Sequence, residues 1–126
     1  MKSILSPLFA LLIFTVSAQA AEAPASVDQM LNTLLTAIEQ NDSESFNSVC
    51  DETMQNAMKK ETLQRVHDQV SKAMVGGYTK TYWGDITRPD DIQGYFWKLA
   101  FTNKPEHDLV AEMWVKDGKV AGFFLR

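Results

Sequence analysis

The dipeptide Asp117-Gly118 constrains the fold of this chain more than any other feature of its sequence. Apolar, β-branched and aromatic residues flank it at 108–116 and at 119–126. An Asp-Gly pair readily adopts the two positive φ angles that a tight hairpin loop requires. Because the chain before residue 76 has the periodicity of helices, the hairpin predicts an α+β fold.

Three helices are predicted ahead of the sheet. The first begins at Ser26, with Gln29 in the spacing of a capping box. The segment 41–43 ends this helix and caps the second, and Gly76-Gly77 stops the third. Each helix carries an apolar stripe with helical spacing. The stripes are Val27, Met30, Leu31, Leu34, Leu35 and Ile38; Phe46, Val49, Cys50, Met54, Ala57 and Met58; and Leu63, Val66, His67, Val70 and Met74.

The remaining chain is typical of strands. Segments 78–86 and 93–102 are rich in aromatic and β-branched residues, and turns are expected at 88–91 and 103–106. Together with the closing hairpin these segments predict a four-stranded antiparallel meander. No internal repeat or second boundary is visible, so 26–126 is expected to be a single α+β domain, with three helices packed on a curved sheet.

The first 20 residues have the pattern of a secretory signal peptide. A basic start at Lys2 precedes the apolar run 4–16, and Ala18-Gln19-Ala20 is a small-residue cleavage site. The apolar run is too short to span a bilayer. We therefore expect cleavage after Ala20, a linker at 21–25, and a periplasmic or secreted product with no stable membrane anchor. A retained anchor is the alternative.

The charge balance argues against nucleic acid as a partner. The formal charge of −4 becomes −5 when Lys2 is removed, because Lys2 is the only charged residue in the predicted signal peptide. The basic residues are scattered and form no cluster that would attract a phosphate backbone.

Cys50 is the only cysteine, so no intramolecular disulfide is possible. Its position on the apolar stripe of a helix favours a small buried residue. A reactive thiol or a bridge between two chains is the alternative.

The hairpin loop also predicts which strand residues share a face. With Asp117-Gly118 at its centre, Trp114 opposes Ala121 and Glu112 opposes Phe123. Alternation then gives one face without charge, which is expected to pack on the helices. This inner face holds Tyr95, Trp97, Leu99, Phe101, Leu109, Ala111, Met113, Val115, Val120, Gly122 and Phe124. The outer face holds Phe96, Lys98, Ala100, Val110, Glu112, Trp114, Ala121, Phe123 and Leu125.

The outer face carries more large apolar side chains than a water-exposed sheet needs. Phe96, Trp114 and Phe123 are the candidate interface residues on it, and they favour a homodimer formed through this face. The alternative is that a loop, the N-terminal linker or the curvature of the sheet covers these side chains.

The chain resembles a known family in its helices, its Gly-Gly stop and its final hairpin strand, Lys-Asp-Gly-Lys-Val-Ala-Gly-Phe-Phe-Leu. It is similar to small exported members of the nuclear-transport-factor-2-like superfamily, and to the domain of unknown function 3887 among them. The resemblance covers most of the chain after residue 20. It implies a curved sheet wrapped against the helices, forming a cone with a pocket. Relatives include ketosteroid isomerases, polyketide cyclases and binding modules, and fold alone does not choose among these activities.

The inner face points to binding more than to catalysis. A pocket lined by Tyr82, Tyr95, Trp97 and Met113 is predicted, and the last three strands offer no inward acid, base or histidine. No catalytic residue, cofactor or metal site is therefore assigned, since the two histidines and one cysteine lack metal-ligand spacing.

Two hypotheses follow for the function. The first is an exported, non-catalytic module that binds a small apolar ligand or a protein partner. The second is an isomerase or cyclase that uses His67 or Asp85 with a tyrosine. The sequence favours a structural interpretation of both residues, with His67 as a core histidine bonded to a backbone carbonyl and Asp85 as a solvated turn carboxylate.

Overall fold

A computed structural model describes residues 22–126. The predicted signal peptide and residue 21 lie outside the described residues. The order of elements is α1 (Ala25–Gln40), α2 (Ser43–Asn47), α3 (Glu52–Ala57), α4 (Lys60–Val75), β1 (Tyr78–Thr87), β2 (Gln93–Phe101), β3 (Lys104–Lys116) and β4 (Lys119–Leu125). The predicted α+β class is confirmed, and the sheet is an antiparallel meander in the order β1-β2-β3-β4.

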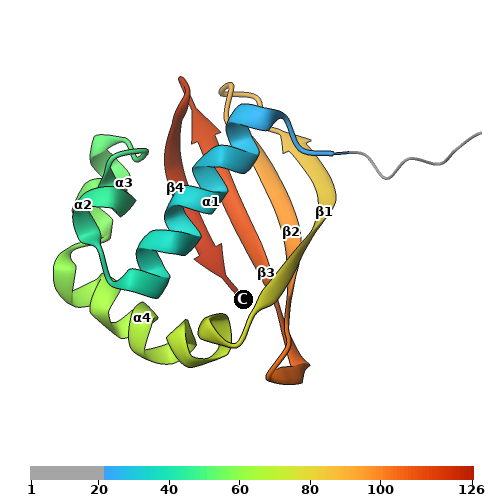
Figure 1. The fold of residues 1–126 in the computed structure, drawn as a ribbon. Coiled ribbons are helices and arrows are strands. Elements are labelled where there is room, and N and C mark those ends of the chain that lie inside the picture. Colours follow the sequence, from blue (N-terminus) through green and yellow to red (C-terminus); the bar gives the residue numbers. More distant parts are fainter. Residues whose placement is uncertain (1–21) are drawn as a thin grey trace, which may run out of the picture.

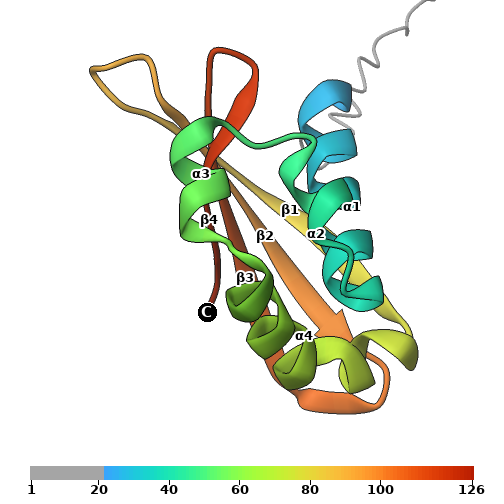
Figure 2. The ribbon, with the colours of Figure 1, turned by 90° about the vertical axis from the view of Figure 1, so that its left-hand side faces the viewer.

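The helices cover one face of the sheet. Figure 1 shows α1 crossing that face, with α2 and α3 beside β4, and Figure 2 shows α4 ending near the turn between β2 and β3. Neither view shows the sheet curling strongly around the helices, so the predicted cone is not established. The core lies between the two layers, where the apolar stripe of α1 meets inward side chains of β2, β3 and β4.

The helical region differs from the prediction in two places. α1 begins at Ala25, one residue before the predicted start. The residue at its N-cap is Pro24, whose carbonyl accepts from two backbone N–H groups of the first turn, so Ser26 is not the cap. The predicted second helix is two short helices, α2 and α3. Asp51 caps α3 by accepting from the backbone N–H of Met54 at 2.8 Å. The cap at Asp42 is confirmed, and its bonds to Ser45 lower the pKa of that carboxyl.

A backbone bridge explains the division of the second helix. Cys50 pairs in parallel with Val120 of β4. The N–H of Val120 donates to the carbonyl of Val49 at 2.8 Å, and the N–H of Asp51 donates to the carbonyl of Val120 at 2.9 Å. These two bonds require an extended backbone around Cys50, which a continuous helix does not provide.

The hairpin loop is confirmed, but the predicted register is right only beside it. Asp117 and Gly118 both have positive φ, and Val115 pairs with Val120. Beyond this point a bulge at Ala121 shifts the pairing, so that Trp114 opposes Gly122. One extra residue reverses the alternation of the rest of the strand.

The expected faces of the end of β4 are therefore wrong. Phe123 points inward and is only 7% exposed, with its ring against Phe46 at 6.2 Å between centroids. Phe124 is 44% exposed on the outer face, where the guanidinium of Arg126 stacks on its ring. Leu125 also turns inward, as a lining residue of the cavity described below. Phe123 is not available as an interface residue.

The predicted turn at 103–106 is shorter than expected. It consists of Thr102 and Asn103, and β3 already begins at Lys104. Asn103 packs so closely on the end of α4 that a Cβ on Gly76 would lie 1.8 Å from its side-chain nitrogen. Gly76 is thus needed for this close approach, and Gly77 for its φ of +98°.

The inward direction of Phe123 and the outward direction of Phe124 give a test of the register. Phe123→Ala should lower the free energy of unfolding by about 3–5 kcal/mol, because it removes a buried ring and leaves a cavity. Phe124→Ala, the matched control, should cost about 1 kcal/mol or less, since the ring is partly in water. Urea denaturation of both variants measures the difference, and equal losses or the reverse order would contradict the bulge.

Candidate functional site

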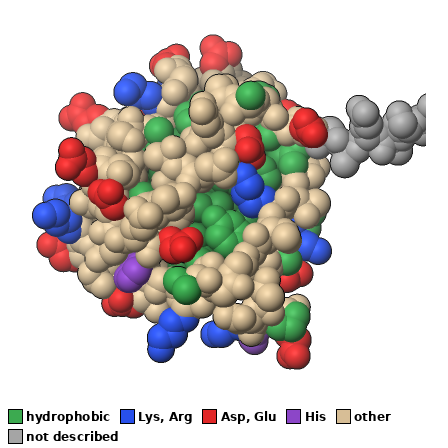
Figure 3. All heavy atoms as spheres, viewed as in Figure 1, with side chains coloured by type: hydrophobic (Ala, Val, Ile, Leu, Met, Phe, Trp, Pro, Cys, Tyr) green, Lys and Arg blue, Asp and Glu red, His purple; other side chains and the backbone are tan. Residues whose placement is uncertain are grey.

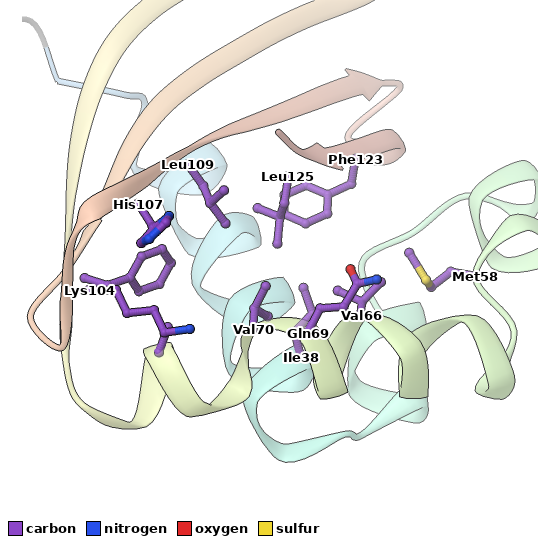
Figure 4. Close-up of a pocket in the computed structure, with 12 residues that line it drawn as sticks. Ile38, Met58, Val66, Gln69, Val70, Lys104, His107, Leu109, Phe123 and Leu125 are labelled. Atoms are coloured by element: carbon purple, nitrogen blue, oxygen red, sulfur yellow. The ribbon is translucent and has the colours of Figure 1, made fainter.

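A mainly apolar concavity lies between α4 and the strand ends that face it. Its volume is about 370 Å³, within the range of small-molecule sites. Figure 4 shows side chains from both layers pointing into it. The lining residues are Ile38, Met58, Val66, Gln69, Val70, Ala73, Phe101, Lys104, His107, Leu109, Phe123 and Leu125.

Two separate features of the sequence build its apolar walls. On α4, Val66, Val70 and Ala73 recur at helical spacing and form one stripe. On β4, Phe123 and Leu125 reach the cavity because the bulge at Ala121 turns them inward. Without the bulge, alternation would point both residues to the other face of the sheet.

Three polar side chains border the cavity. Gln69 comes from α4, while Lys104 and His107 come from the first part of β3. All three residues are exposed to solvent. In Figure 4, Lys104 and His107 lie at one end of the cavity, Met58 lies at the other, and the amide of Gln69 lies between them. The cavity is therefore mainly apolar, with its basic side chain at one end.

The four residues predicted to line a pocket do not line this cavity. Trp97 and Met113 are fully buried in the core, and Tyr95 is also a core residue. Tyr82 packs on Trp97 with ring centroids 5.5 Å apart. Tyr82 and Trp97 border a different hollow, about 650 Å³ in volume and more open to solvent, between the start of α1 and β1. The inward direction of the side chains was predicted correctly for β2 and β3, but in this part of the interior the side chains fill the space.

The two tyrosine hydroxyls in this region have local partners. Tyr95 donates to the side-chain carbonyl of Gln93 at 2.7 Å, and Tyr82 donates to the carboxylate of Asp85 at 3.4 Å. Burial, and after it the charge of Asp85, raises the pKa of both phenols. Both hydroxyls therefore remain protonated at neutral pH and act as hydrogen-bonding groups.

The proposed acid–base residues are not brought to the cavity. The Nδ1 of His67 lies 2.8 Å from the carbonyl oxygen of Ile38 and donates to it in the Nδ1–H tautomer. This is the structural role that the sequence also allowed. Asp85 is exposed and does not line the cavity; it pairs with Tyr95 in the sheet, and its carboxylate accepts from the hydroxyl of Tyr82. His107, which is exposed and belongs to β3, is the histidine that lines the cavity.

The outer face is partly covered by its own side chains. Trp114 and Phe96 stack edge to face at 5.9 Å, and the indole N–H of Trp114 donates to Glu112 at 2.7 Å. The indole of Trp114 packs directly on the backbone of Gly94, where an added Cβ would lie 2.5 Å from the ring. Trp114 thus belongs to the packing of the sheet as much as to its surface.

The most exposed large apolar side chains of this face are on the edge strand β1. Trp83 is 59% exposed and Ile86 is 52% exposed. Together with Phe96 and Val110 they border a shallow, mainly apolar hollow. We call Trp83, Ile86, Phe96 and Val110 the outer patch. Trp83 lies at a bulge, between the paired residues Tyr82 and Gly84. No local pattern in the sequence indicates this bulge.

The helix-bearing side of the molecule is also incompletely covered by polar groups. Figure 3 shows hydrophobic side chains exposed near its middle, with acidic and basic side chains around them. An ion pair joins the two layers, since Lys80 of β1 contacts Asp28 of α1 at 2.9 Å. In residues 22–126 no helix has the length and hydropathy needed to cross a membrane. Nor do these residues contain a group of three or more His, Cys, Asp or Glu side chains placed to hold a metal ion.

Comparisons with known proteins give this chain no relative. No family model matches it. No curated protein and no solved structure matches it either. The structure therefore establishes the α+β architecture, with helices on one face of a four-stranded antiparallel meander, and no family.

The thiol of Cys50 tests the predicted burial of this residue. Cys50 is buried and its thiol donates to the carbonyl of Phe46, and burial raises its pKa to about 12. The thiolate is the reactive form, so at pH 8 a thiol reagent should label the native protein at least about a hundredfold more slowly than the urea-unfolded protein. A Cys50→Ala/Ser48→Cys variant, with its cysteine at an exposed position, is the control and should label fast in the native state. Fast native labelling of Cys50 would show that the thiol is accessible.

Proposed function

We propose that the protein is an exported, non-catalytic binding module whose cavity between α4 and the β3–β4 pair holds a small apolar ligand. The observation that carries this proposal is the cavity itself, about 370 Å³ in volume and lined mainly by aliphatic and aromatic side chains from both layers. A concave apolar site with a few polar groups at one end is the usual form of a small-molecule site.

The energetics support an apolar ligand. Each methylene that leaves water contributes about 0.8 kcal/mol. A chain of about ten carbons therefore gains up to about 8 kcal/mol, against an association cost of at least about 4 kcal/mol. The walls made by Val70, Phe123 and Leu125 offer such a chain no charged group. The net gain is at most about 4 kcal/mol, so a dissociation constant of about a millimolar is expected from the chain alone.

Export and ancestry are parts of the same proposal. Export rests on the signal-peptide pattern of residues 1–20 and places the module in a periplasm or outside the cell. The order of helices followed by an antiparallel meander supports a distant relation to the nuclear-transport-factor-2-like superfamily. In that superfamily a pocket between helices and sheet is a common binding site, as the cavity is here.

Filling the cavity tests the binding role. Ala73→Leu places a larger side chain among the cavity walls, so it should lower the affinity for a hydrophobic fluorescent dye at least about tenfold while the fold is kept. Ala57→Leu is the matched control, because Ala57 is exposed on α3 and does not line the cavity. Fluorescence titration gives the affinities and circular dichroism checks the fold. Equal dye affinity in both variants and the parent protein would refute ligand binding at this site.

We further propose that two copies associate through the outer face of the sheet. The outer patch supports this, because Trp83 and Ile86 lie more than half exposed beside Phe96 and Val110. Apolar side chains gathered in this way on a sheet are typical of an association surface. A two-fold dimer uses the same patch on both copies, so no further surface is required.

Trp83→Glu tests the dimer without disturbing the packing around Trp114. The variant should be a folded monomer by light scattering, because two buried carboxylates would face each other near the dimer axis. Val75→Glu is the control, since Val75 is the most exposed large apolar residue and lies at the end of α4, outside the outer patch. A parent protein that stays monomeric up to about millimolar concentration, or a Trp83→Glu protein with an unchanged dimer mass, would rule out this association.

A further inference from the structure

We infer that the ligand of the cavity is a single-chain amphiphile with a carboxylate head, bound with its head at Lys104 and His107 and its chain directed toward Met58. This inference rests on the proposed binding function and specifies the chemistry of its ligand. A medium-chain fatty acid is the simplest molecule of this class.

The first argument is the polarity of the cavity along its length. Figure 4 shows Lys104 and His107 at one end, the aliphatic side chains of Val70, Leu109 and Leu125 between, and Met58 at the far end. A purely apolar ligand would leave the polar end without a partner. A ligand with one polar head and one apolar chain matches both regions.

The second argument is the sign of the charge at the polar end. Lys104 is cationic, and within residues 22–126 it forms no ion pair with a side chain or with the C-terminal carboxylate. By contrast, three other basic residues are paired. These pairs are Lys80 with Asp28, Lys98 with Asp108, and Arg126 with Glu112.

The acidic residues nearest in sequence do not neutralise this end. Asp108 contacts Lys98 at 3.8 Å, on the outer face. Glu106 is exposed and is not among the residues that line the cavity. In the described residues neither His107 nor Gln69 makes a side-chain hydrogen bond, so both can donate to a ligand. At this end of the cavity Lys104 and His107 offer two potential donors and one fixed positive charge, which suit a carboxylate.

The size of the cavity argues for one chain. About 370 Å³ is near the lower limit of small-molecule sites. Such a volume suits a single chain of moderate length better than the paired chains of a membrane lipid. Decanoate is therefore a suitable probe, with 1-decanol and decyltrimethylammonium as neutral and cationic probes of the same chain length.

Isothermal titration of the whole protein with these three probes tests the inference. Decanoate should bind about tenfold more tightly than 1-decanol, and decyltrimethylammonium should bind more weakly than either. Lys104→Gln should weaken decanoate binding about tenfold and leave 1-decanol binding unchanged, because only the charge of the head is affected. Lys116→Gln is the matched control, since this exposed lysine lies beside the hairpin loop, at the opposite end of β3.

The possible failures are distinguishable. If decanoate and 1-decanol bind equally and Lys104→Gln changes neither, the head-group inference is wrong and the apolar ligand site stands. If decanoate binds but Ala73→Leu does not weaken it, the amphiphile binds elsewhere and the inference is also wrong. If none of the probes binds to the folded protein, the proposed binding function falls together with the inference.

Discussion

The backbone bridge between Val120 and the segment around Cys50 is the contact on which much of this structure depends. It uses the N–H and the carbonyl of one strand residue to attach the helical layer directly to the edge of the sheet. The same two bonds keep residues 49–51 extended, so the second apolar stripe divides into α2 and α3. Side chains reinforce the bridge, since Phe46 of α2 packs on Phe123 of β4 and Cys50 is buried beside it.

The bulge that follows this bridge links the fold to the candidate site. Ala121 adds one residue to β4, so Phe123 and Leu125 point to the helices. It also places Gly122 opposite Trp114 and turns Phe124 to the outer face. One irregularity therefore supplies a wall of the cavity on one face and changes the side chains presented on the other. Bulges commonly change the direction of side chains near functional sites in this way.

These contacts also explain how far the sequence could predict the structure. The hairpin loop followed from Asp117-Gly118, because its φ requirements are local, and the inward positions of Trp97 and Met113 followed from strict alternation in β2 and β3. The bulge at Ala121 has no local pattern, since Ala and Gly beside it fit either face of a strand. The cavity depends on this bulge and on the distance between α4 and β3. Neither is encoded in a short window of residues, so the sequence indicated Trp97 and Met113, which are buried in the core, and not the residues that line this cavity.

The two proposed activities occupy opposite faces of one sheet. The cavity faces the helices through Leu109 and Leu125, whereas the outer patch faces away from them through Trp83 and Ile86. Between them lies a layer of backbone whose inward side is filled by Trp97 and Met113. Close-packed layers of this kind transmit a change of shape only when they have a second stable arrangement. Ligand binding and self-association are therefore expected to be energetically independent. A dimer would have two separate cavities, one on the helix side of each copy, away from the dimer interface.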